Sequence, residues 1–138
     1  MTRLRLTQYN EEKHRSLAQE WALDHAGYPG EVIDMLPPLG VCVEKDFGSD
    51  DWEPIAFLWA HMSVDVGRAF MEMPITRPGL SLWDASEVIS FAINGIEEIL
   101  KGHSYTIIEL VCNDAQARFL LGCGYMVNGR KVQMFKKI

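Results

Sequence analysis

The clearest pattern of apolar and polar residues lies in the middle of the chain. Arg68–Ile75 is short and apolar and predicts a strand, and the turn formers Pro78 and Gly79 follow it. Ser81, with Asp84 three residues later, is typical of the first turn of a helix. Beyond this start, apolar residues recur at intervals of three and four, which predicts a long amphipathic helix with one buried face: Leu82, Ala85, Val88, Ile89, Ala92, Ile96, Ile99 and Leu100.

The first turn of that helix has properties that bear on function. Its leading backbone N–H groups have no partner within the helix, and the helix dipole places a partial positive charge there. The start of a helix is therefore a natural place to hold a phosphate group. The alternative is that Ser81 is only a helix cap and the nearby Arg77 only a solvated side chain. The sequence leaves both interpretations open.

Shorter elements are predicted on either side of this central unit. Before it, the pattern indicates a strand at Leu4–Leu6, a helix from Glu11 to Gly27, helical turns within Glu31–Leu36, and strands at Gly40–Lys45 and Ile55–Met62. After it, the pattern indicates a central strand at Tyr105–Val111, a helix from Asn113 to Leu121, and a final strand at Lys131–Ile138. Three successive strands with helices before and after them predict a mixed α/β or α+β protein with one sheet, in a single domain of residues 1–138.

Composition and charge limit the classes of function. Of 138 residues, 48% are hydrophobic and 23% charged, which is ordinary for a globular protein. The net charge of −6 argues against nucleic-acid binding, which needs a basic face. We find neither an apolar run of roughly 18 residues that could cross a membrane nor a signal peptide, and we expect a cytoplasmic protein. The cysteines have no metal-ligand spacing, so neither a metal site nor a disulfide framework is indicated: Cys42, Cys112 and Cys123.

Two local patterns, together with the order of elements, resemble the GCN5-related N-acetyltransferases, the GNAT superfamily. Thr76–Ser81 stands where that family has a loop of the form Gln/Arg-x-x-Gly-x-Gly/Ala, and Gly79 fits it. Asn113–Tyr125 is similar to the family's Asn-led helix that ends in Gly followed by an aromatic residue. The ARFL core of this helix and the short chain are also similar to small phage-encoded GNAT-like proteins with a degenerate active site.

The resemblance implies a GNAT-like α/β (α+β) fold with a single mixed, mostly antiparallel sheet and helices on both faces. It also implies acetyl-CoA as cofactor, with the pantetheine arm along the Arg68–Ile75 strand and the pyrophosphate at the start of the next helix. The residues that it places around the coenzyme are Met71, Met73, Arg77, Gly79, Leu80, Ser81, Asn113 and Arg118.

Several residues depart from the family pattern. Thr76 replaces the usual Gln or Arg, and Pro78 removes an N–H donor from the phosphate loop. Asp84 adds a negative charge close to the place where an anion would bind. Leu120 stands at the position where many members have a tyrosine that acts as general acid. Each change weakens anion binding or removes a catalytic group.

Acetyl transfer to an amine needs a base for the amine proton and an acid for the departing thiolate. Glu72 is the first candidate for the base and Glu109 the second; the alternative is that Glu72 points outward from a half-solvated strand. For the acid, only water or Cys123 is left, since Tyr125 is expected to pack in the core.

Two functions therefore remain open. One is an acyl-CoA-dependent N-acetyltransferase that modifies a small amine or a protein amino group. The other is an inactive GNAT-fold binding or assembly protein, associated with phage. Neither involves nucleic acid or a membrane, and a homodimer is left open. The acidic segment Glu44–Glu53 is either a solvated loop or an attraction for a cationic amine.

Overall fold

A computed structural model describes residues 3–25, 34–132, 134, 136 and 138; the side chain of Met73 also lies outside the described part. Its helices and strands follow in the order β1 (Leu4–Gln8), α1 (Glu11–Asp24), β2 (Leu39–Asp46), β3 (Trp52–Met62), β4 (Arg68–Thr76), α2 (Leu82–Gly102), β5 (Ile107–Glu109) and α3 (Asp114–Gly122). Within the described residues no helix is long and apolar enough to cross a membrane.

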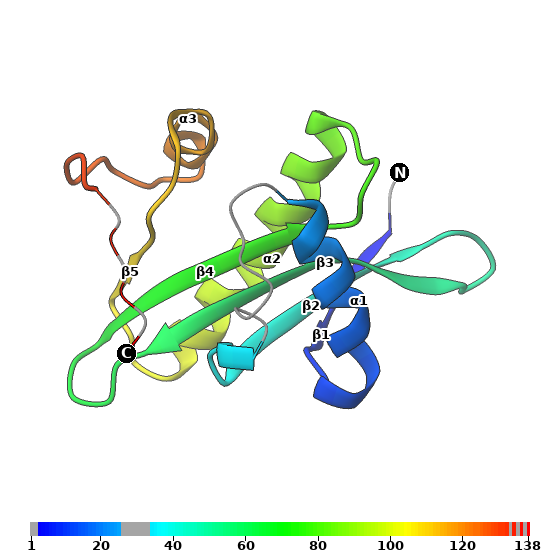
Figure 1. Cartoon of the computed structure of the whole chain (residues 1–138), viewed down its shortest axis with the longest axis horizontal. Coiled ribbons are helices and arrows are strands. Elements are labelled where there is room, and N and C mark those ends of the chain that lie inside the picture. Colours follow the sequence, from blue (N-terminus) through cyan, green and yellow to red (C-terminus); the bar gives the residue numbers. More distant parts are fainter. Residues whose placement is uncertain (1–2, 26–33, 133, 135, 137) are drawn as a thin grey trace.

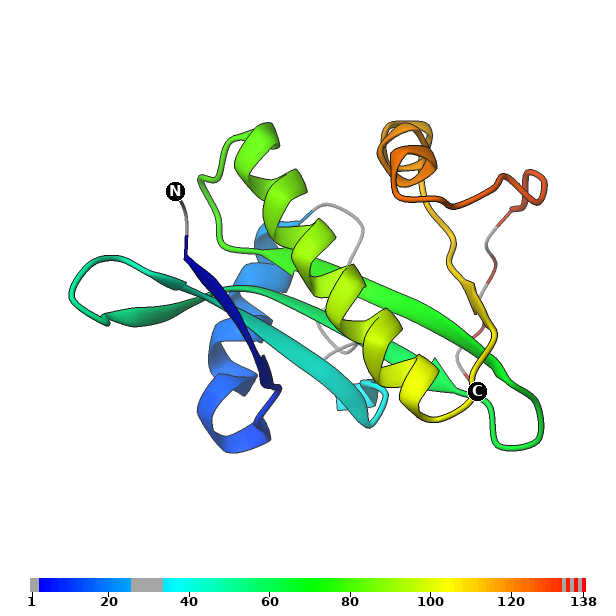
Figure 2. The same ribbon diagram turned by 180° about the vertical axis from the view of Figure 1, so that it is seen from behind.

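The strands form one sheet in their sequence order, β1-β2-β3-β4-β5. The first four strands pair antiparallel, and β5 pairs parallel to β4. Figures 1 and 2 show a layered arrangement in which α1 lies over one face of the sheet and α2 runs across the other. The predicted mixed, mostly antiparallel sheet with helices on both faces is confirmed.

Helices α1 and α2 each cover a hydrophobic core, one on either face of the sheet. The core under α2 contains buried residues of that helix, of β2, β3 and β4, and one residue of α3, all at most 6% exposed: Val41, Val43, Ile55, Ala56, Leu58, Ala60, Ala69, Met71, Val88, Ala92, Ile93, Ile96, Leu100 and Leu120. The core under α1 is smaller and largely aromatic, with Trp21, Phe57 and Trp59 at its centre. From Val88 onward, the apolar residues at intervals of three and four in the sequence therefore lie on the face that α2 buries, whereas Leu82 in its first turn is 86% exposed.

Local polar contacts explain where the helices begin. The side chains of Asn10, Ser81 and Asn113 each accept a hydrogen bond from the backbone N–H three residues later, at Lys13, Asp84 and Gln116. Asn113 and Gln116 complete a capping box, because the Gln116 side chain also accepts from the Asn113 N–H. At Ser81 the structure shows only the Ser81 half of such a box.

Three sequence predictions need correction. Tyr105–Val111 was expected to be a central strand, but only Ile107–Glu109 pairs, and β5 is an edge of the described sheet with Ile107 half exposed. Among the described residues of Lys131–Ile138 none is in a strand. Helix α1 ends at Asp24 with His25 as its cap, so it stops before Gly27, which lies outside the described residues. Apolar alternation alone does not specify a pairing partner.

Candidate functional site

The site suggested by the sequence lies where β4 and β5 part. The two strands pair only over Arg68–Phe70 against Ile107–Glu109. Beyond these residues β4 continues to Thr76, whereas the chain after β5 turns away from it toward α3 (Figure 1). The second half of β4 therefore has no strand neighbour on that side among the described residues.

A β-bulge interrupts β4 in this second half. Trp59 pairs with Glu72 and Phe57 with Ile75, so Leu58 lies opposite two residues, Met73 and Pro74. The extra residue reverses the alternation of side chains: Met71 packs in the core under α2, whereas Ile75, four residues later, packs in the core under α1. A bulge leaves backbone polar groups without ladder partners, and Pro74 has no N–H to lose. This is the stretch along which a pantetheine arm was expected.

In the turn from β4 into α2, one residue, Gly79, has the open backbone that a phosphate-binding loop needs. Gly79 has φ +88°, and a Cβ placed there would meet nothing within 4 Å, so the backbone is open to a ligand. Leu80 is half-buried and Ser81 exposed. Ser81 Oγ already accepts from the Asp84 N–H at 3.0 Å, which uses one of the first-turn donors of α2.

Arg77 is directed to the β2–β3 hairpin and away from the start of α2. Its backbone N–H donates to the Ile55 carbonyl at 2.8 Å. Its guanidinium pairs with Glu53 at 3.0 Å and lies over the Phe47 ring at 5.4 Å from the centroid. Both members of the ion pair are nearly half exposed, so the pair contributes little stability. Arg77 can therefore exchange Glu53 for another anion at small cost.

The two candidate bases lie on neighbouring strands but in different surroundings. Glu72 is opposite Trp59 and so on the α1 side of the sheet, 41% exposed, with Oε1 3.8 Å from His61 Nε2. Glu109 is held by Arg68, with 2.5 Å between Oε2 and Nη2. Because the Glu109 carboxylate is occupied by Arg68 and is the less exposed of the two, Glu72 is the more accessible candidate base. His61, on β3, lies beside this candidate base.

The second predicted pattern lies on α3 and just after it. The Asn113 side chain is taken up by the capping box, while Arg118 is exposed. Leu120 is 5% exposed and packs in the core under α2. Tyr125 is half-buried, and its hydroxyl donates to Glu97 at 2.9 Å. Burial and this contact raise the pKa of Tyr125 above its ordinary value, so the phenol stays protonated at neutral pH.

Other features of the described part lie elsewhere. A hollow of about 550 Å³ lies between β1 and α2, and one of about 280 Å³ lies between the β3–β4 turn and the end of α2. Neither is lined by a residue of the predicted coenzyme or catalytic set. Among the described residues no group of three or more His, Cys, Asp or Glu side chains is placed to hold a metal ion.

Comparison with known proteins identifies the fold. No family model and no curated protein matches the sequence. Among solved structures, a Trypanosoma brucei acetyltransferase superposes with a TM-score of 0.70 at 13% identity, covering 97% of this chain and all of that one. The aminoglycoside N-acetyltransferase AAC(6')-Iy in complex with CoA gives 0.68 at 11%, covering 100% and 97%. A transcriptional regulator from Bacillus halodurans gives 0.65 at 13%, covering 97% and 100%.

The chain therefore has the GNAT acetyltransferase fold over its whole length, as the sequence patterns suggested. At 11–13% identity this likeness concerns the fold alone. The presence of a transcriptional regulator among structures of this shape makes the same point, because one fold serves several functions. The chemistry has to be argued from the residues of this chain.

Proposed function

We propose that this protein is an acyl-CoA-dependent N-acetyltransferase that modifies a small amine or a protein amino group. The observation that carries the proposal is the combination of a bulged β4, its separation from β5 after Phe70, and the open turn at Gly79. The CoA complex of AAC(6')-Iy, which has the same fold, supports acetyl-CoA as the acyl donor.

We assign two groups of residues to the coenzyme, one around Gly79 to its pyrophosphate and one on β4 to its pantetheine arm. The open backbone around Gly79 and the first-turn N–H groups of α2 would hold the pyrophosphate, with Leu80 and Ser81 supplying backbone donors. Arg77 would have to leave Glu53 to contribute, and Arg118 is exposed on α3. Met71 would contribute only backbone groups, because its side chain is in the core. The contribution of the Met73 side chain stays a prediction outside the described residues.

When bound, the coenzyme supplies an activated thioester. The chain's own task is then to hold the thioester oxygen with backbone N–H groups at the β4 bulge and to remove the proton of the incoming amine. We assign the removal of this proton to Glu72, acting directly or through one water, because Glu72 is half exposed and is not held by an arginine. The alternative is that Glu72 is only a surface residue of β4, in which case Glu72→Gln would leave kcat unchanged. Leu120 is buried and supplies no acid, so the proton for the thiolate comes from water or from Cys123.

Coenzyme binding is the first test. Acetyl-CoA at about 100 times its dissociation constant should raise the free energy of unfolding by about 2.7 kcal/mol, measured by thermal unfolding with and without coenzyme. Gly79→Ala should weaken this effect, because a side chain at φ +88° strains the turn that faces the ligand. Gly129→Ala is the matched control: it also has positive φ and open surroundings but lies beyond α3, so it should leave binding unchanged.

Catalysis is tested separately, by release of free CoA thiol with a panel of primary amines. Glu72→Gln should lower kcat by about 10²–10⁴-fold while coenzyme binding persists. Glu109→Gln, on the neighbouring strand, should have a small effect. A large loss with Glu109→Gln and none with Glu72→Gln would reverse the assignment of the base.

The second candidate function is a GNAT-fold binding or assembly protein without chemistry. It is favoured by the pairing of Arg77 with Glu53, by Asp84 next to the expected anion site, and by Leu120 in place of a catalytic tyrosine. Absence of any thermal shift at millimolar acetyl-CoA would favour this function and exclude the transferase.

A further inference from the structure

The hollow between β1 and α2 lies at the opposite edge of the sheet from β4 and β5. It is an open surface hollow with a volume of about 550 Å³. It has two walls, one from α2 and one from the starts of β1 and β3. The lining residues are Glu87, Ser90, Phe91 and Asn94 on the first wall, and Arg3, Leu4 and Trp52 on the second.

The α2 wall is a stripe separate from the face that the helix buries. Its four residues are spaced i, i+3, i+4 and i+7, so they lie on one side of the helix. Three of the four are polar, and Phe91 lies between them. Among the described residues, the side chains of Glu87 and Asn94 take part in no hydrogen bond or ion pair, so both can bind a ligand without losing a partner.

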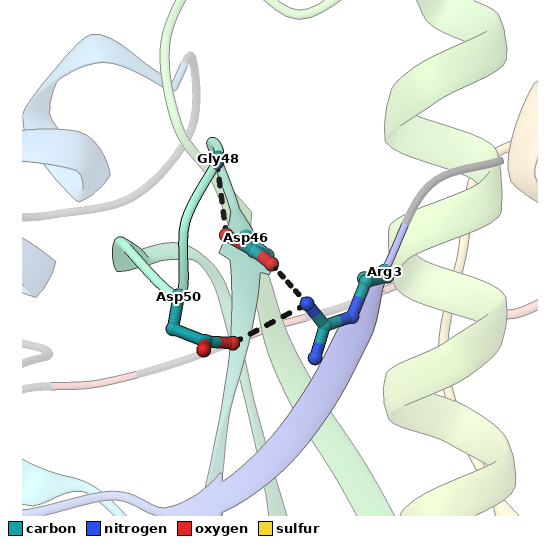
Figure 3. Close-up of polar contacts among 4 residues, drawn as sticks. All are labelled: Arg3, Asp46, Gly48 and Asp50. Carbon is teal, nitrogen blue, oxygen red and sulfur yellow. Dashed lines mark hydrogen bonds and ion pairs between the residues drawn. The ribbon is translucent and has the colours of Figure 1, made fainter.

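The opposite wall presents a cation whose charge is already neutralised. Arg3 Nη1 lies 2.5 Å from Asp46 and 3.3 Å from Asp50, which Figure 3 shows together with the contact of Asp46 to the Gly48 N–H at 2.9 Å. The Asp46 side chain is only 5% exposed, so this arrangement is well held. Arg5, which lies over Trp52, pairs with Glu44 in the same way. With Glu87 across the hollow, four carboxylates stand against two guanidiniums, and Glu87 is the one carboxylate of this set without a cationic partner among the described residues. The local field therefore favours a cation over an anion.

Trp52 forms the aromatic part of the second wall, and two arginines hold its ring in place. Arg5 lies 4.3 Å and Arg3 5.2 Å from the Trp52 ring centroid, and Arg5 also pairs with Glu44 at 3.1 Å. The stacked guanidiniums fix the position of the indole. Trp52 and Phe91 are both half-buried and offer apolar area to a flat ligand.

We propose that this hollow is a binding site for a small organic cation with a flat apolar body, such as an arylalkyl ammonium. The ammonium binds the Glu87 carboxylate, the Asn94 carbonyl accepts a further hydrogen bond, and the body lies between Phe91 and Trp52. Because the hollow is lined by α2 whereas Glu72 lies on the α1 side of the sheet, a cation bound here is not the acceptor of an acetyl group. None of the residues that line the hollow belongs to the set assigned to the coenzyme.

The test uses the full chain without acetyl-CoA and three probes of similar size: phenethylamine, which is cationic, 2-phenylethanol, which is neutral, and 3-phenylpropionate, which is anionic. The readout is the indole N–H resonance of Trp52, assigned by its loss in Trp52→Phe. We expect a saturable shift of this resonance with phenethylamine, and weaker binding of the other two probes at the same ionic strength. Glu87→Gln should weaken phenethylamine binding about fivefold.

Glu98→Gln is the matched control, since Glu98 is also on α2 but pairs with Lys101 outside the hollow. It removes the same charge and should leave phenethylamine binding unchanged. Equal binding of phenethylamine and 2-phenylethanol, tighter binding of 3-phenylpropionate, or an equal loss in both variants would overturn the proposal. So would a Trp52 resonance that does not respond to the amine. Because no step uses acetyl-CoA, failure of the transferase proposal would not alter these results.

Discussion

Gly40→Ala should destabilise the fold because the place of its side chain is already filled. Gly40 lies in β2 opposite Trp59 of β3. A Cβ on Gly40 would be 2.5 Å from Trp59 Nε1, 2.6 Å from Trp59 Cδ1 and 2.9 Å from Tyr9 Cβ, all shorter than real contacts of a Cβ. Trp59 is 0% exposed and lies between the rings of Tyr9 and Phe57, with centroids at 5.1 and 5.8 Å, so the indole has little room to move.

The magnitude follows from two opposing effects. Overfilling a packed core costs about 1–3 kcal/mol. Replacing a strand glycine by alanine by itself stabilises the fold by about 0.5–1 kcal/mol, since alanine has less backbone freedom to lose when the chain folds. The net loss in the free energy of unfolding should be about 1–2 kcal/mol, measured by urea denaturation with an unchanged m-value. Gly102→Ala at the end of α2, where a Cβ meets nothing within 4 Å, is the control and should be neutral or stabilising.

The double variant with Trp59→Phe decides whether the contact is the cause. The Trp59 Nε1–H has no hydrogen-bond partner among the described residues, so the change to phenylalanine removes the nearest contacting atom without breaking a bond. The smaller ring also has room to shift, so in this background Gly40→Ala should cost less, giving a coupling energy of about 1 kcal/mol. An undiminished cost in the Trp59→Phe background, or no cost in the parent protein, would refute the reasoning.

Three further predictions concern the first half of the chain and the start of α2. His14 is 2% exposed, its Nδ1 accepts a hydrogen bond from the Asn10 N–H, and burial lowers its pKa from 6.5. The neutral imidazole therefore stabilises the fold above pH 6.5, and the free energy of unfolding measured with urea should fall as the pH drops through the folded-state pKa, less so in His14→Gln. Ser81→Ala should cost about 1 kcal/mol in thermal unfolding through loss of the α2 cap, and an unchanged Tm would contradict the cap's role. Arg5→Met leaves Glu44, whose side chain is 4% exposed, without its partner and should lower the free energy of unfolding, measured by urea denaturation, by about 3 kcal/mol. Arg15→Met, which removes an exposed ion pair, should lower it by less than about 1 kcal/mol.

Much of the fold could be predicted from local patterns because the helices and the inner strands bury one face each. The apolar spacing of α2 and the caps at Asn10, Ser81 and Asn113 are local features, and each is present in the structure. The candidate site was only partly predictable. The Gly79 turn can be read from sequence, whereas the pairing of Arg77 with Glu53 and of Glu109 with Arg68 depends on strands that meet only after folding.

The sequence by itself determined the order of elements as far as α3, the helix starts, and which face of α2 is apolar, because these depend on neighbours within a few residues. Tertiary structure alone decided that Ile107–Glu109 lies at an edge of the described sheet and not at its centre, since strand position depends on which partners pair. It also decided why a glycine stands inside α2: a Cβ on Gly95 would lie 2.5 Å from Leu6 Cδ2 of β1. The bulge that turns Met71 and Ile75 to opposite faces likewise arises from pairing with β3, which no local pattern encodes.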